Sequence, residues 1–350
     1  MSDNGQPNPI INALSNAVAA IRADDDQLAL AKAHEALHPK AIEKLSVAEA
    51  RQQPTVADAV RHLLAEQGRS SDPAVLVPGV RLSTLTIETE YGPLPANVYT
   101  PDTIDTADMS GTTRPLPVVL YFHGGGWVIA DKDVYDGGAR GLAKEAHAIV
   151  VSVDYRQAPE HKFPAAWDDA LASYRWLTQN AAQLGGDPSR LALAGESAGG
   201  NLAVATAIAA RDAGLPQPRH VLSVYPVAQT SLNTESYLEN AIAKPLNRAM
   251  VKWFVDHLVR SEADLADPRL SLVDAALAGL PPVTLINARI DPLRSDGAKL
   301  EDALQTAGVP VQRAEYEGVA HEFFGAASVL EKARHAQAYT GERLRAAFAL

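Results

Sequence analysis

From Pro117 onward, short apolar runs alternate with segments of helical periodicity, and this alternation limits the possible folds of the 350-residue chain more than any other feature. Runs that are apolar at nearly every position predict strands buried on both faces of a sheet. Strands interleaved with helices imply an α/β fold with a mostly parallel central sheet flanked by helices. The expected strands are 118–122, 148–153, 191–194, 221–225, 283–287 and 311–316, with helices expected over 167–180, 201–213 and 297–308.

Three segments lie outside this alternation. Residues 10–68 have apolar side chains at helical spacing, so helices are expected ahead of the sheet. Residues 82–90 and 96–99 alternate as two strands joined by a turn at Tyr91-Gly92-Pro93. Between Tyr225 and Val283 no strand is expected, and a helical pattern there includes Met250, Trp253, Phe254 and Leu258. A long insertion after a sheet strand is typical of a lid over a site.

The charge balance and the lack of cysteine exclude several classes of function. The chain has 31 basic and 42 acidic residues, a net charge of −11, which argues against binding nucleic acid or an anionic membrane surface. With no cysteine, it has no disulfide, no thiolate metal site and no cysteine nucleophile. The first nine residues do not resemble a secretory signal, and the apolar runs are too short to span a bilayer. We therefore expect a cytoplasmic protein.

The pattern Gly195-Glu196-Ser197-Ala198-Gly199 stands between the expected strand 191–194 and a helix that continues from Asn201. Strand, tight turn and helix form the context of a nucleophile elbow, in which the serine hydroxyl projects above the sheet. Glycine at both ends of the pattern avoids Cβ clashes where strand and helix nearly touch. A glycine-rich turn with an incidental serine is the alternative, because the five-residue pattern alone is common.

A second glycine-rich segment, His123-Gly124-Gly125-Gly126-Trp127, follows the expected strand ending at Phe122. Glycines leave their backbone N–H groups unshielded, and together with the N–H of Ala198 they are suited to binding the oxyanion of a tetrahedral intermediate. A phosphate-binding loop is disfavoured because no lysine follows at the required position. A plain structural turn stays open as the alternative.

A serine nucleophile needs a base and an acid that orients the base. Asp291 follows the expected strand 283–287, and His321 follows 311–316, in the chain order Ser, Asp, His that this kind of fold uses. Asp291 has a simpler alternative as a helix cap, and Asp296 is a rival acid. Nine other histidines compete with His321, but one belongs to the glycine-rich loop and the others do not follow a late strand.

Five motifs together resemble the hormone-sensitive lipase family of bacterial esterases. The resemblance covers the chain from about Leu82 to the C-terminus, and the motifs are 123–127, 154–161, 195–203, 291–294 and 321–323. Within the second of these, residues 154–160 are interpreted as a structural segment that orders a loop under the site.

The resemblance implies an α/β-hydrolase fold with a helical cap and the hydrolysis of short to medium acyl esters without a cofactor or metal. It assigns Ser197, Asp291 and His321 as the triad, with Gly125, Gly126 and Ala198 as the oxyanion donors. The cap combines residues 1–75 with an insertion at 230–268, and the hydrolase core comprises 76–229 and 269–350. The resemblance also permits a homodimer, through the edge strand 311–316.

Two residues depart from the family pattern. Glu196 stands where aspartate is usual, so we expect the local hydrogen bonding to be kept but reshaped. Glu322 stands where glycine usually follows the histidine, and it is expected to crowd or charge the pocket entrance. Trp127 and Trp253 are predicted to line the substrate pocket, with core packing as an equal alternative, whereas Phe254 is expected in the core.

These observations predict a carboxylic ester hydrolase that acts on a small-molecule ester through an acyl-enzyme intermediate. Two alternatives stay open. One is a related acyl hydrolase acting on amides, carbamates or acetylated sugars, which the same scaffold would serve. The other is a non-catalytic receptor for a small ligand on the same fold, which would be expected to lack a member of the triad.

Overall fold

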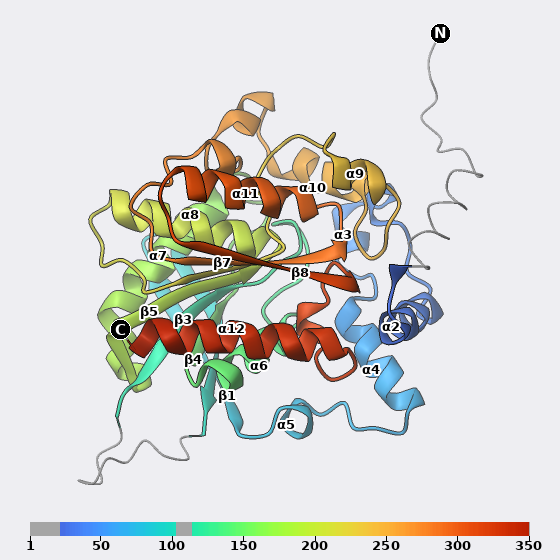
Figure 1. Cartoon of the computed structure of the whole chain (residues 1–350), viewed down its shortest axis with the longest axis horizontal. Helices are drawn as coiled ribbons and strands as arrows, with labels where there is room; N and C mark the ends of the chain where they lie inside the picture. The colour runs from blue at the N-terminus through green and yellow to red at the C-terminus, as the bar shows by residue number, and fades with distance from the viewer. Residues whose placement is uncertain (1–21, 103–113, 350) are drawn as a thin grey trace.

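The computed structural model of the chain describes residues 22–102 and 114–349, and its centre is an eight-stranded sheet in the order β1-β2-β4-β3-β5-β6-β7-β8 (Figure 1). The strands are β1 (Val80–Thr89), β2 (Gly92–Pro101), β3 (Leu116–Phe122), β4 (Ile149–Val153), β5 (Gly186–Glu196), β6 (Val221–Val224), β7 (Val283–Ile290) and β8 (Val311–Ala320). The helical pattern predicted for residues 10–21 lies outside the described residues.

The sheet is mostly parallel, as the sequence predicts. β1 and β2 form an antiparallel hairpin in which Thr89 pairs with Gly92, and β2 pairs antiparallel with β4. All neighbouring strands from β4 to β8 run parallel. The carboxyl ends of the parallel strands therefore meet at one edge of the sheet, which is where such folds place their ligands.

Helices cover both faces of the sheet (Figure 1). One layer contains α6 (Asp136–Ala146) and α12 (Glu331–Ala349), which pack against each other, and the other contains α7 (Ala165–Asn180), α8 (Ala198–Asp212) and α11 (Arg294–Thr306). Each face has its own apolar core, and β3 serves both because successive side chains alternate: Val118 and Leu120 enter one core, while Val119 and Tyr121 enter the other.

Shorter helices from two distant segments gather beyond the carboxyl ends of β7 and β8 (Figure 1). They are α2 (Asp25–Ala36), α3 (Val47–Ala50) and α4 (Val56–Glu66) from the N-terminal segment, and α9 (Glu235–Glu239) and α10 (Arg248–Leu258) from the segment after β6. The segments touch directly: Trp253 Nε1 donates to the Leu45 carbonyl (3.2 Å). The division into a cap of 1–75 plus 230–268 over a two-part core stays a prediction, with which this contact agrees.

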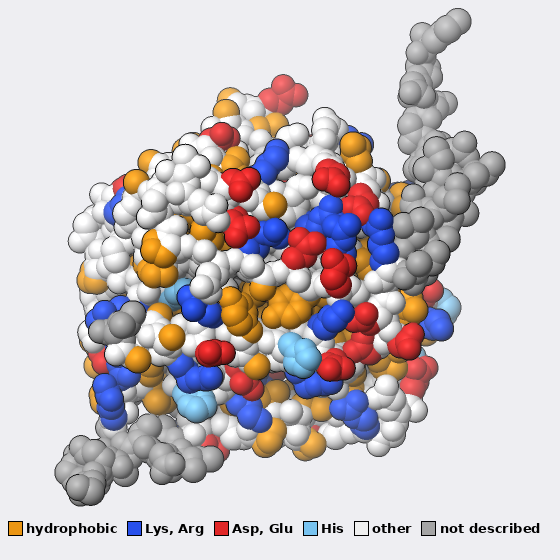
Figure 2. Space-filling view, viewed as in Figure 1, with side chains coloured by type: hydrophobic (Ala, Val, Ile, Leu, Met, Phe, Trp, Pro, Cys, Tyr) orange, Lys and Arg blue, Asp and Glu red, His pale blue; other side chains and the backbone are white. Residues whose placement is uncertain are grey.

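The remaining elements are short. They are α5 (Pro73–Leu76) and the 3₁₀ turns η1 (Ile42–Lys44), η2 (Ala181–Leu184), η3 (Glu262–Ala266), η4 (Leu272–Asp274) and η5 (Phe324–Ala326). Among the described residues, no helix combines the length and the apolar character needed to cross a bilayer. Figure 2 shows acidic and basic side chains interspersed on one face of the molecule, rather than a basic stripe of the kind that follows a phosphate backbone.

Candidate active site

Ser197 occupies a sharp turn between β5 and α8. Its backbone has φ 57° and ψ −117°, a conformation that costs free energy for any residue with a side chain. Two close approaches enforce the glycines around it, because a Cβ on Gly195 would collide with the Gly199 carbonyl, and one on Gly199 would collide with the Phe122 carbonyl. The Ser197 N–H donates to the Val224 carbonyl (2.8 Å), which ties the turn to the neighbouring strand. This is the strand–turn–helix context that the sequence predicts.

The structure brings His321 and Asp291 to this serine. The His321 Nε2 lies 3.0 Å from the Ser197 Oγ, and its Nδ1 lies 2.7 Å from the Asp291 Oδ2. All three side chains are buried, with exposed fractions of 6% for Ser197, 4% for His321 and 0% for Asp291. Hydroxyl, imidazole and carboxylate are thus connected in series, an arrangement able to remove a proton from the serine and to stabilise the imidazolium that results.

Asp291 also has the capping role considered as its simpler alternative. Its Oδ1 accepts the N–H of Leu293 (2.8 Å) in the turn before α11, while Oδ2 faces His321. The rival acid Asp296 serves another loop: its carboxylate accepts the N–H of Ala228 (3.0 Å) and the side-chain amide of Gln229 (3.0 Å). Burial raises the pKa of Asp296 to about 7, against the effect of these hydrogen bonds. Of the two acids, only Asp291 contacts the imidazole.

The environment of His321 favours its protonated form. Burial lowers the pKa of the imidazole, but the charge of Asp291, the hydrogen bond to it and the charges of Glu322 and Glu196 together outweigh burial, so the net pKa is raised above 6.5. Tyr225 packs against the imidazole with ring centroids 4.5 Å apart. The histidine is therefore held in one orientation and prepared to carry a positive charge.

The glycine-rich loop adopts backbone conformations that glycine favours. Gly125 has φ 101° and Gly126 has φ 61°. Among the described residues, the N–H groups of Gly125, Gly126 and Ala198 have no hydrogen-bond acceptor. Gly125, Gly126 and Ser197 line one cavity, so this loop and the elbow face the same space. Unsatisfied N–H donors at such a site can bind a developing oxyanion.

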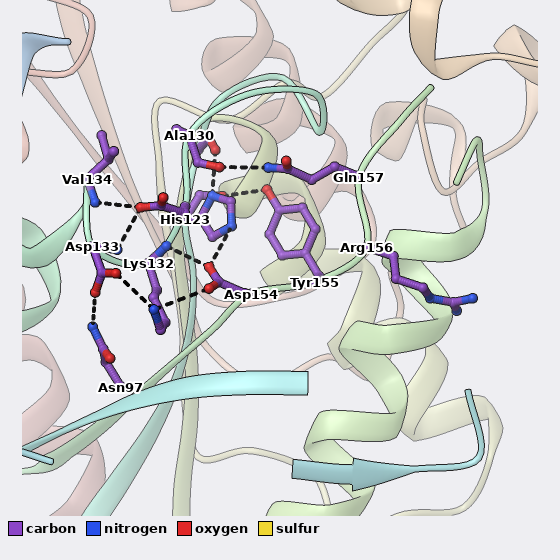
Figure 3. Close-up of polar contacts among 12 residues, drawn as sticks. Asn97, His123, Ala130, Lys132, Asp133, Val134, Asp154, Tyr155, Arg156 and Gln157 are labelled. Atoms are coloured by element: carbon purple, nitrogen blue, oxygen red, sulfur yellow. Dashed lines mark hydrogen bonds and ion pairs between the residues drawn. The ribbon is translucent and has the colours of Figure 1, made fainter. Parts of the chain in front are cut away.

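The segment from Asp154 to Gln157 holds this loop in place (Figure 3). Asp154 accepts the N–H of Lys132 (2.7 Å), and the Tyr155 hydroxyl donates to the His123 carbonyl (2.9 Å). The ring of Tyr155 stacks on that of His123 at 4.4 Å. The Gln157 amide donates to the carbonyls of Ile129 and Ala130, which follow the glycine-rich loop. These contacts agree with the structural role interpreted for residues 154–160.

Arg51 connects the N-terminal segment to the same region, a contact that sequence reasoning missed. Its guanidinium donates to the carbonyls of Val128 (2.9 Å) and Ala158 (3.0 Å) and forms an ion pair with Glu160 (2.7 Å). The contacts join positions 77 to 109 residues apart, so no local pattern could have indicated them.

A cavity of about 650 Å³ opens above Ser197 and His321. Met250 and Phe254 line it, but neither tryptophan of the sequence prediction does. Trp127 has φ 60°, which is the left-handed region, and its ring is buried against Trp167 with centroids 5.1 Å apart. Trp253 lies against His257 and η1, where its N–H is satisfied. The two tryptophans therefore pack in the interior, and Phe254, which was expected there, forms part of the wall.

The two departures from the family pattern occupy one neighbourhood. Glu196 is buried beneath the elbow, where its carboxylate accepts hydrogen bonds from the hydroxyls of Tyr121 and Tyr225. Burial raises its pKa to about 7, although both hydrogen bonds act in the opposite direction. Glu322 has φ 64° and accepts a hydrogen bond from the Tyr135 hydroxyl (3.1 Å) at the cavity wall.

In the described part of the chain, no three His, Asp or Glu side chains group as metal ligands.

Known proteins share both the sequence and the fold of this chain. Residues 119–325 match the family described as the alpha/beta hydrolase fold. The carboxylesterase NlhH of Mycobacterium tuberculosis is 40% identical over 83% of this chain and 90% of its own length. An ethyl acetate hydrolase of Pseudomonas putida is 36% identical over 72% of this chain and 78% of its own.

A solved structure extends the likeness to three dimensions. A thermostable esterase from Pseudomonas putida superimposes with a TM-score of 0.81 at 29% identity, covering 94% of this chain and 98% of its own. Sequence, fold and motifs agree, and the chain belongs to the hormone-sensitive lipase family of α/β-hydrolase esterases.

Proposed function

We propose that this protein, a carboxylesterase of the serine hydrolase class, uses Ser197 as its nucleophile, His321 as its base and Asp291 as the group that orients the base. The observation that carries the proposal is the series of two contacts, 3.0 Å from Ser197 to His321 and 2.7 Å from His321 to Asp291, at the bottom of a cavity. A positioned hydroxyl–imidazole–carboxylate series is the arrangement that acyl transfer to serine requires.

The first half of the reaction acylates the enzyme. His321 Nε2 takes the Ser197 proton as Oγ attacks the ester carbonyl carbon, and the carbonyl oxygen becomes an oxyanion. The N–H groups of Gly125, Gly126 and Ala198 donate to that oxyanion, and one such donor contributes about 3 kcal/mol to transition-state stabilisation. Collapse of the intermediate breaks the bond to the alcohol oxygen, which receives the proton from His321. The acyl group then remains on Ser197.

The second half releases the acid. Water enters on the side vacated by the alcohol, and His321 removes a proton from it as the oxygen attacks the acyl-enzyme carbonyl. Collapse of the second intermediate returns the proton to Ser197 Oγ and frees the carboxylic acid. Asp291 keeps the imidazole in the tautomer whose Nε2 can accept a proton, and it stabilises the cation in both halves.

The substrate class we propose is esters with short to medium acyl chains. The cavity of about 650 Å³ has the size of a small-molecule site. The ring of Phe254 forms the part of its wall that lies against Gly126 of the glycine-rich loop. Amides, carbamates and acetylated sugars would be attacked by the same groups, so a panel of matched esters and amides separates these activities.

The test of the proposal combines the Ser197→Ala variant with a fluorophosphonate probe. The wild-type protein is expected to hydrolyse p-nitrophenyl acetate and to take up the probe at Ser197, while the variant does neither and keeps its fold by circular dichroism. Near-wild-type turnover in the variant would overturn the assignment of the nucleophile. A wild-type protein that neither reacts nor labels would point to the receptor alternative instead.

Two further predictions concern the state of the protein. β8 is an edge strand in the described sheet, and a homodimer through that edge is what the family resemblance permits. Light scattering on the purified protein checks it, with the mass of a single chain as the contrary outcome.

The cytoplasmic location also stays a prediction, checked by fractionating cells that express the protein.

A further inference from the structure

A second cavity, of about 390 Å³, lies beside the active-site cavity and shares part of its wall. Val56, Val134 and Glu322 line both. Away from this shared wall, the second cavity is lined by α4, α5, the start of α6 and the loop after His321. Much of its lining is apolar, including Val60, Leu64, Leu76 and Ala326. A chamber of this size and lining is suited to a small organic group.

The positive charges that line the second cavity are already neutralised. Arg61 donates to Asp58 (2.6 Å) on the same helix, and Arg140 forms an ion pair with Asp136 (2.8 Å). An incoming anion would therefore find no unpaired arginine there.

Two carboxylates are not matched in this way: Glu322 at the shared wall, and Glu196, which lines the second cavity alone. Glu322 accepts one hydrogen bond, from the neutral hydroxyl of Tyr135, and Glu196 accepts from two tyrosine hydroxyls. Among the described residues, neither forms an ion pair with a lysine or arginine. Glu322 therefore presents negative charge at the boundary of both cavities, where a cation would supply the missing partner.

Glu322 also adjoins the residue beside which the alcohol part of an ester must lie. In the proposed mechanism, His321 gives its proton to the leaving alcohol oxygen, so that oxygen is beside the imidazole when the bond breaks. Glu322 is the next residue in the chain, and its left-handed backbone conformation belongs to the turn that carries His321. The acyl part extends from the same carbonyl carbon in another direction.

We propose that the second cavity is the subsite for the alcohol part of the substrate, and that Glu322, at the wall it shares with the active-site cavity, selects an alcohol bearing an ammonium group. The inference rests on the proposed ester hydrolysis and adds a substrate class to it. The apolar walls accommodate the carbon substituents of such a group, and the Glu322 carboxylate attracts its charge. An alcohol that carries a carboxylate is repelled by the same residue.

The test uses the acetate ester of choline, called choline acetate below. It is compared with its neutral isostere, in which carbon replaces the quaternary nitrogen. Shape is the same in the two esters, so their ratio of kcat/KM measures the effect of charge alone. We expect the wild-type enzyme to favour choline acetate by about tenfold, which corresponds to a modest ion pair at a partly solvated site. Glu322→Gln keeps the size of the side chain and should bring the ratio to about one.

Glu322 could also affect the chemistry at His321, but that effect would be the same for both esters. It therefore cancels in the ratio of their kcat/KM values measured on one variant. A wild-type ratio near one, or a ratio that Glu322→Gln leaves unchanged, overturns the proposal. Hydrolysis of p-nitrophenyl acetate in the same samples separates this failure from a failure of the proposed function. If p-nitrophenyl acetate is hydrolysed and neither the choline ester nor its carbon isostere is hydrolysed, the subsite is absent and esterase activity stands.

A second pair of variants tests the place of the subsite. Val60→Phe narrows the second cavity from α4, while Ala65→Phe adds the same ring to the exposed side of that helix. We expect Val60→Phe to lower kcat/KM for choline acetate by about tenfold and to change that for methyl acetate less than twofold. Ala65→Phe should change neither. An equal loss for both esters in Val60→Phe would show that the alcohol lies elsewhere.

Discussion

Asp291 contacts His321 through one carboxylate oxygen, with Oδ2 2.7 Å from Nδ1, and is itself held through the other, which accepts the Leu293 N–H. The carboxylate is fully buried, so its position is set by the start of the turn before α11 rather than by solvent. The Asp291 carboxylate therefore orients the imidazole, and the Leu293 N–H orients that carboxylate. The catalytic geometry depends on the contact with Leu293 as much as on the contact with His321.

Replacing Asp291 with asparagine should abolish most of the activity while keeping the shape of the site. The asparagine amide can donate a hydrogen bond to Nδ1 of His321, and the imidazole proton then resides on Nε2. In that tautomer Nε2 cannot accept the proton of Ser197. A loss in kcat of about ten-thousand-fold is expected, as for the same change in other serine hydrolase triads. Steady-state kinetics on p-nitrophenyl acetate gives the measurement, with circular dichroism to verify folding.

Asp296→Asn is the matched control for that variant. Asp296 binds the backbone of the loop after β6 and does not contact the imidazole, so its loss should affect stability more than kcat. If Asp296→Asn lost as much activity as Asp291→Asn, the assignment of the orienting acid would have to be reversed.

The rate should depend on pH through the imidazole of His321. The base acts in its neutral form, so kcat/KM increases as pH rises through the pKa of the free enzyme. Because Asp291 raises that pKa against the effect of burial, the midpoint of the acidic limb is expected above 6.5. Asp291 makes the largest contribution that raises this pKa, ahead of the charges of Glu322 and Glu196, so in Asp291→Asn the residual activity should have its midpoint at lower pH. A wild-type midpoint well below 6.5 would contradict this environment.

The elements that carry the site could be predicted because each has a local signature. The elbow around Ser197 is encoded by two glycines whose spacing is enforced by the approach of strand and helix. Asp291 and His321 follow strands whose apolar character is evident in the sequence, although β7 and β8 extend beyond the predicted runs, to Ile290 and Ala320. Chain order and the shared sheet edge then bring the three together.

The sequence indicates Glu322 near the pocket, but most of the walls of the cavities could not be predicted, because they depend on contacts between distant segments. Tyr135 and Glu322 are 187 residues apart, and Arg51 contacts the Ala158 carbonyl, which lies 107 residues later in the chain. The direction of Trp127 depends on a positive φ that a non-glycine residue rarely adopts, so its aromatic character alone could not indicate where the ring points.

Glu196 should make the stability of the protein depend on pH in an unusual direction. Its pKa is raised from 4.5 to about 7 in the folded state, so the folded protein binds this proton more tightly than the unfolded chain. The resulting stabilisation is fully present below pH 4.5 and is lost as the pH rises through about 7. Urea unfolding of the wild type and of Glu196→Gln isolates this group, because all other titrating groups are common to both.

Between pH 5 and pH 8, the wild type should lose about 2 kcal/mol of unfolding free energy relative to Glu196→Gln. A glutamine keeps the hydrogen-bonding shape toward Tyr121 and Tyr225 but cannot ionise. A constant difference between the two proteins over this range would mean that Glu196 does not titrate there.

Phe254 should control which acyl chains fit, whereas its neighbour Trp253 should not. Phe254 lies directly against Gly126, so closely that a Cβ at position 126 would collide with its ring, and it lines the active-site cavity. Phe254→Ala should cost about 3 kcal/mol of stability and move the preferred p-nitrophenyl ester to longer acyl chains. Trp253→Phe removes the hydrogen bond to the Leu45 carbonyl, at about 1 kcal/mol, and should leave the chain-length profile unchanged. The two profiles, measured from acetate to decanoate, distinguish a wall residue from a packing residue. A shift in the Trp253 variant with none in the Phe254 variant would reverse the two roles.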